Sequence, residues 1–99
     1  MNDIIRAVPS IIQIGSLIEN HESVHGGRPC IAGTSVSVRR IALWYKAGLV
    51  PEEIVRKFGH LSLAQVYAAL AYYHANRDGI EADLESEARI TEALEQTSD

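Results

Sequence analysis

The sequence has a single cysteine, no long apolar run and few basic residues near its start. One thiol, Cys30, excludes an internal disulfide framework. A membrane helix needs about 18 consecutive apolar residues, and no run in this chain approaches that length. The first residues lack the basic and apolar regions of a signal peptide. We therefore expect a cytoplasmic protein with no membrane partner and no cofactor.

Charge is divided unevenly along the 99 residues. Residues 1–25 carry a net charge of −2, and residues 26–77 carry +5 from seven cations and two acids. Residues 78–99 carry −7 from eight acids and Arg89. These boundaries predict a lead-in, a basic domain and an acidic arm, the last two with different partners. The open alternative is that the acids only solvate a terminal helix.

Extended segments are predicted before the helices. The β-branched run Ile11–Ile14 predicts a short strand, and Ser16–Asn20 is a possible extension of it. Arg28–Ile31 and Thr34–Val38 predict two further extended pieces that reverse at Gly33, because glycine adopts a positive φ at little cost. We expect the segment that contains these two pieces to pair strands or to form a dimer contact.

Two helices follow, each with start and stop signals. Ser37 is placed to cap the first helix, which Gly48 ends. Pro51 suits the first position of the second helix, because its missing N–H has no partner there in any case. Gly59 is expected to end this second, two-turn helix.

A third helix is expected to start after Ser62, with Gln65 completing a capping box. It should run to about Asn76, where Asp78-Gly79 breaks it. Residues 80–96 then predict an acidic helix with a thin apolar stripe, which needs a partner surface to be stable. The predicted partner-binding residues of this stripe are Ile80, Leu84, Ile90 and Leu94.

The second and third helices, joined by Gly59–Leu61, match a helix-turn-helix, whose second helix can enter a DNA major groove. Phosphate contacts are predicted for four cations, which are Arg39, Arg40, Arg56 and Lys57. Base contacts are predicted for three residues early in the third helix, which are Ser62, Gln65 and Tyr67. The alternative is that these residues are solvated surface and that the module only packs against protein.

Three motifs in this order resemble the family called domain of unknown function 433. They are GGRPCIAGT at Gly26–Thr34, PEEI at Pro51–Ile54 and LSLAQV at Leu61–Val66, and the resemblance covers about residues 16–84. It implies a mainly α fold: a homeodomain-like three-helix bundle behind a short β element. Ser35 stands where the family usually has arginine, so any contact of that arginine with DNA or with an acid of a partner is missing in this chain.

Many members of that family resemble antitoxins of the VapB kind, encoded beside toxins with a PIN-like nuclease fold. The resemblance therefore implies a non-enzymatic regulator of a type II toxin–antitoxin system, and we expect the chain to form a homodimer. It would occlude the active site of a ribonuclease and repress its own operon. The alternative is an interaction or dimerisation module whose helix-turn-helix does not bind DNA.

Metal or catalytic chemistry has little support in the residue pattern. His21, His25 and Cys30 form a set that is one ligand short of a structural zinc site, and two glycines make the loop flexible. Glu52 and Glu53 diverge by about 100° on a helix and are poorly placed to share a substrate. We expect no catalytic residue and no metal, and a small metal- or ligand-binding protein remains the third hypothesis.

Overall fold

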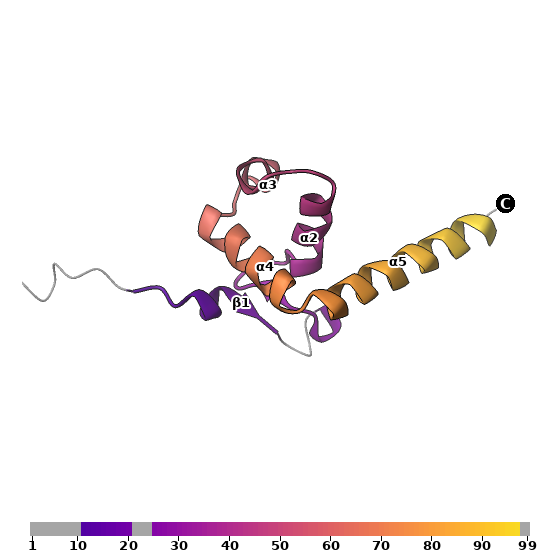
Figure 1. The fold of residues 1–99 in the computed structure, drawn as a ribbon, viewed down its shortest axis with the longest axis horizontal. Coiled ribbons are helices and arrows are strands. Elements are labelled where there is room, and N and C mark those ends of the chain that lie inside the picture. The colour runs from indigo at the N-terminus through magenta and orange to yellow at the C-terminus, as the bar shows by residue number, and fades with distance from the viewer. Residues whose placement is uncertain (1–10, 21–24, 98–99) are drawn as a thin grey trace, which may run out of the picture.

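The computed structural model describes residues 11–20 and 25–97, and it is mainly helical (Figure 1). Within this part of the chain, two short strands form one antiparallel sheet. In order, the elements are the 3-10 helix η1 (Ile14–Leu17), β1 (Ile18–Glu19), the 3-10 helix η2 (His25–Gly27), β2 (Cys30–Ile31), α2 (Val38–Lys46), α3 (Pro51–Phe58), α4 (Leu63–Ala75) and α5 (Arg77–Thr97).

The extended piece predicted at Arg28–Ile31 is confirmed by strand β2. The piece predicted at Thr34–Val38 forms no strand. Ile18 lies opposite Ile31 across the β1–β2 pair. After a reversal at Gly33, where φ is 75°, only an isolated bridge joins Ser37 to Cys30. The second piece is therefore a single contact rather than a strand.

The strand predicted at Ile11–Ile14 is wrong. Ile11 and Ile12 lie outside regular structure, and Ile14 begins η1. The three isoleucine side chains are 84%, 67% and 62% exposed, so they have no core to cover. β-Branched residues favour strands only where they pack on a neighbour. The pairing strand, Ile18–Glu19, lies instead in the extension considered at Ser16–Asn20.

Helix starts and stops follow the local signals. Ser37 Oγ accepts a hydrogen bond from the Arg40 amide at 3.1 Å. Ser62 and Gln65 form a reciprocal capping box, with bonds of 3.2 and 2.7 Å. Gly59 ends α3 with φ of 75°. These caps confirm the predicted starts of α2 and α4 and the end of α3.

The break predicted at Asp78-Gly79 is wrong. Asn76 leaves the helical conformation (φ −126°, ψ 37°), and α5 starts at the next residue and includes Gly79. Glycine costs a helix about 1 kcal/mol relative to alanine. Ile80 is only 6% exposed and packs in the core, and this burial outweighs the cost.

The core lies where α4 packs against both α2 and α3. Its largest fully buried side chains are Tyr73, Ile31, Ile41, Ile54, Val38 and Val66. The outer part of α5 stands away from this body (Figure 1). Among the residues described, no helix has both the length and the apolar character needed to cross a membrane.

Candidate functional site

Helix α5 has an inner half bound to the body and an outer half that is exposed. Ile80 is 6% exposed, and Leu84 is partly buried against the core. Ile90 and Leu94 are 58% and 65% exposed. The structure thus separates the four residues predicted to bind a partner. Ile80 and Leu84 stabilise this chain's own fold, and the exposed stripe is narrowed to Ile90 and Leu94.

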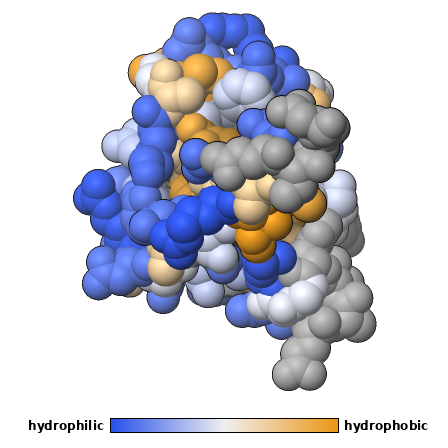
Figure 2. Space-filling view, turned by 90° about the vertical axis from the view of Figure 1, so that its right-hand side faces the viewer, coloured by the Kyte–Doolittle hydropathy of each residue, from blue (hydrophilic) through white to orange (hydrophobic). Residues whose placement is uncertain are grey.

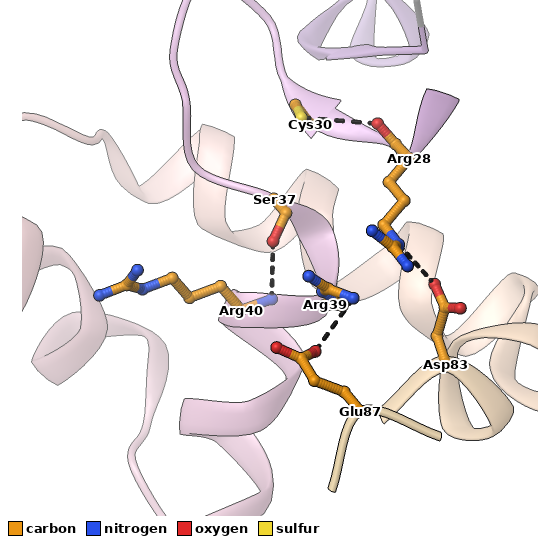
Figure 3. A network of polar contacts seen from close by, with 7 residues as sticks. All are labelled: Arg28, Cys30, Ser37, Arg39, Arg40, Asp83 and Glu87. Atoms are coloured by element: carbon orange, nitrogen blue, oxygen red, sulfur yellow. Dashed lines mark hydrogen bonds and ion pairs between the residues drawn. The ribbon is translucent and has the colours of Figure 1, made fainter. Parts of the chain in front are cut away.

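Three ion pairs join the inner half of α5 to the basic middle of the chain. They are Arg28–Asp83 at 3.2 Å, Lys46–Glu81 at 2.5 Å and Arg39–Glu87 at 3.0 Å. Figure 3 shows the first and the third of these pairs. Three acids of α5 are therefore neutralised by cations of the same chain. Glu92 and Glu95 lie further along, on the projecting part of α5.

Glu81 is the polar junction between α2, α4 and α5. It accepts hydrogen bonds from Lys46 on α2 and from the Tyr73 hydroxyl on α4. These bonds, the Lys46 bond foremost, lower the pKa of the Glu81 carboxyl from its ordinary 4.5. The hydrogen bond with Glu81 also raises the pKa of Lys46 and that of Tyr73.

We expect Glu81→Gln to reduce stability at neutral pH and to flatten its decline in acid. A carboxyl with a lowered folded-state pKa stabilises the fold above its unfolded pKa, near 4.5, and this contribution disappears as pH falls through the folded value. Urea midpoints of the wild type and the variant should therefore converge below about pH 4.5. A gap between them that is independent of pH would contradict this role.

The four predicted phosphate-contacting cations differ in their surroundings. Arg39 is paired with Glu87, whereas the Arg40 guanidinium points away from that pair (Figure 3). Arg40 lies over the Phe58 ring at 5.7 Å, and Lys57 lies over the Trp44 ring at 4.5 Å.

Arg56 is the remaining cation of this set, and it is exposed on α3. Arg40 and Lys57, whose cation–π contacts join α2 to α3, lie where these two helices meet. The cation–π contacts were not predicted from the sequence, because they join residues on different helices.

The predicted base-contacting residues are partly used by the fold. Ser62 Oγ and Gln65 Oε1 both serve the capping box. Tyr67 is 52% exposed on α4. The Ser62 hydroxyl only accepts in this box, so its O–H, the Gln65 amide nitrogen and Tyr67 are left to contact bases.

The predicted metal candidates do not come together in the described residues, which contain no cluster of three metal-ligating side chains. His21 lies outside these residues. Cys30 is 3% exposed, and burial foremost, with the Glu19 charge, raises the pKa of its thiol. A raised thiol pKa disfavours the thiolate that binds metals, so Cys30 packs as a core residue.

These features define a small, mainly helical protein with a two-stranded N-terminal sheet and a projecting acidic helix. A family model described as "Protein of unknown function (DUF433)" matches residues 18–73, more than half of the chain. The chain belongs to this family, as its motifs predicted. All of α5, including Ile90 and Leu94, lies outside the matched residues.

The fold is similar to that of a DUF433 member protein from Anabaena variabilis ATCC 29413, whose crystal structure has been solved. The TM-score is 0.67 and the sequence identity 21%, and the alignment covers 84% of this chain and 91% of that one. At this identity the likeness shows a shared fold alone. No curated protein matches the sequence.

Proposed function

We propose that this chain is an antitoxin-like regulator that binds a PIN-like ribonuclease through the outer half of α5. The observation that carries the proposal is the exposure of Ile90 and Leu94, one helical turn apart, on a helix that extends beyond the body. An isolated helix is marginal in water and gains most of its stability from packing. An exposed apolar stripe on such a helix is typical of helix-in-groove recognition.

The charge of this segment favours a basic partner. Beyond Glu87 the outer half carries Glu92 and Glu95 against Arg89, which is paired with Glu85. A ribonuclease cleft that holds RNA phosphates is positively charged, because cations supply most of the non-specific affinity for nucleic acid. An acidic helix lying in that cleft would exclude RNA and so inhibit the enzyme.

Co-expression tests this function directly. The nuclease encoded beside this gene should arrest growth when it is expressed alone, and the full-length chain should restore growth. A neighbouring reading frame without a nuclease, or toxicity that persists with the chain present, would contradict the proposal.

A second function, repression of its own operon, is supported by the arrangement of α3 and α4. These helices are joined by a short turn at Gly59, as in a helix-turn-helix. Arg40, Arg56 and Lys57 lie beside them as candidate phosphate contacts.

We expect the double variant Arg40→Ala with Lys57→Ala to weaken binding to the upstream DNA and to reduce the salt slope by about 2, one for each lost phosphate contact. Mobility-shift titrations at several salt concentrations measure this slope. Arg89→Ala, on α5, is the matched control and should leave the slope unchanged. Equal slopes in the wild type and the double variant would show that Arg40 and Lys57 do not contact the DNA phosphates.

The alternative, a helix-turn-helix that binds protein but not DNA, has one observation in its favour. The Arg39–Glu87 ion pair occupies a guanidinium group that a phosphate contact would need. Failure of the wild type to shift its own upstream DNA, together with nuclease neutralisation, would establish this alternative.

A further inference from the structure

An open groove of about 690 Å³ lies between α2 and α5. Its floor is apolar or uncharged, with Leu43 and Trp44 from α2 and Leu84, Ala88 and Thr91 from α5. Leu43 is 54% exposed, which is high for a leucine in the middle of a helix. Figure 2, which faces the α5 end of the molecule, shows hydrophobic surface between hydrophilic side chains on that side. The described part of the chain therefore leaves an apolar surface open between these two helices.

Three arginines line the groove, and each already has a contact within the chain. These contacts are the ion pairs Arg28–Asp83 and Arg39–Glu87 and the cation–π contact of Arg40 with Phe58. The positive charge on this side is therefore engaged within the fold, and it does not require an acidic occupant.

The α5 wall of the groove carries acid that is not engaged in this way. Glu92 lines the groove, is exposed, and forms no ion pair with another described residue. Glu95 lines the same wall about one helical turn further along. An acidic occupant would meet like charge here. An apolar floor beside an unpaired carboxylate instead favours an occupant with one apolar face and lysine or arginine along its edge.

The length of the groove suits a helix. Its lining on α5 runs from Leu84 to Glu95, a rise of about 17 Å or three turns at 1.5 Å per residue. Because the groove is bordered by α2 on one side and α5 on the other, a third helix lying in it would pack its side chains between those of both helices. Apolar residues repeated at i, i+3, i+4 and i+7 are the anchors that such helix-in-groove recognition uses.

We propose that this groove binds an amphipathic, basic helix of a partner protein, with its apolar face on the floor and a lysine or arginine beside Glu92. The groove is separate from the surface proposed for the nuclease, because neither Ile90 nor Leu94 lines it. Ile90 lies about 160° around α5 from Ala88 of the floor. The outer half of α5 therefore has two faces, each for a different partner.

A synthetic peptide tests the groove, with Trp44 as the reporter, because the single tryptophan of this chain lines it. The probe is a tryptophan-free helix of about four turns, with leucine at i, i+3, i+4 and i+7 and lysine on both flanks. Titrating it into the full-length chain should shift the Trp44 emission to the blue, because the docked helix replaces water around the indole. A peptide with glutamate in place of lysine should bind about tenfold more weakly or less.

Matched variants separate the groove from general attraction between a basic peptide and an acidic chain. Leu43→Arg places a cation against the apolar face of the peptide and is expected to raise its Kd about a hundredfold. Val50→Arg is the control, since Val50 is 52% exposed and lies outside the groove. Glu92→Lys is expected to raise the Kd about tenfold. Glu85→Lys, which makes the same change of charge outside the groove, should leave it near the wild-type value.

Three results would overturn the proposal: no blue shift with the basic peptide, equal affinity for the basic and acidic peptides, or equal Kd values for the wild type and Glu92→Lys. Ile90→Asp should bind the peptide as the wild type does, and its failure to do so would contradict the separation of the two faces. A chain that binds the peptide but does not neutralise the nuclease would keep the groove and remove the proposed antitoxin function.

Discussion

Replacing Ile54 with alanine is expected to lower the free energy of unfolding by about 3 kcal/mol, in the range of buried isoleucine truncations. Ile54 is fully buried and is the inward residue of the short helix α3. Alanine would remove apolar contact with α2 and α4 and leave a cavity in a small core. Because a single domain has only about 5–15 kcal/mol of stability, this is a large fraction.

Urea denaturation followed by circular dichroism measures the change. Val50→Ala is the matched control, since Val50 precedes α3 and is 52% exposed. It should change the stability by no more than about 0.5 kcal/mol. A loss below about 1 kcal/mol for Ile54→Ala would mean that the core does not hold α3 in place.

Replacing Ile90 with aspartate is expected to weaken binding of the neighbouring nuclease about a hundredfold, close to 3 kcal/mol. The substitution would place an unpaired charge in the apolar centre of the proposed interface, where burial of a charge is costly. In the free chain Ile90 is 58% exposed, so its replacement should change stability little. Growth rescue should fail while the variant stays folded.

Ala88→Asp is the control for the added negative charge. Ala88 is also exposed on α5, and it lies about 160° around the helix from Ile90, outside the proposed apolar stripe. Its variant should keep the wild-type affinity, measured by calorimetry, and should still rescue growth. Equal affinities for Ile90→Asp and the wild type would show that the nuclease binds elsewhere.

The features that were predictable from the sequence depend on neighbouring residues. The Ser62–Gln65 capping box and the positive φ of Gly59 follow from short-range hydrogen bonding and sterics, so the sequence alone indicates them. Membership of the family was also predictable, because the three motifs and the distances between them are properties of the sequence itself.

The features that were missed depend on tertiary contacts. Arg28 and Asp83 are 55 residues apart, and only folding brings α5 back across the basic middle. The same packing buries Ile80 and carries α5 through Gly79, against the local signal. The pattern around Ile11 predicted a strand because it cannot show whether a pairing strand lies alongside.

The central claim is that the outer half of α5 is the partner-binding element. Hydrogen exchange of the full-length chain, alone and mixed with the neighbouring nuclease, tests it most directly. The account predicts fast exchange beyond Glu87 in the free chain, strong protection of these amides in the complex, and little change in α3 and α4. Protection confined to α3 and α4, or unchanged exchange in α5, would contradict it.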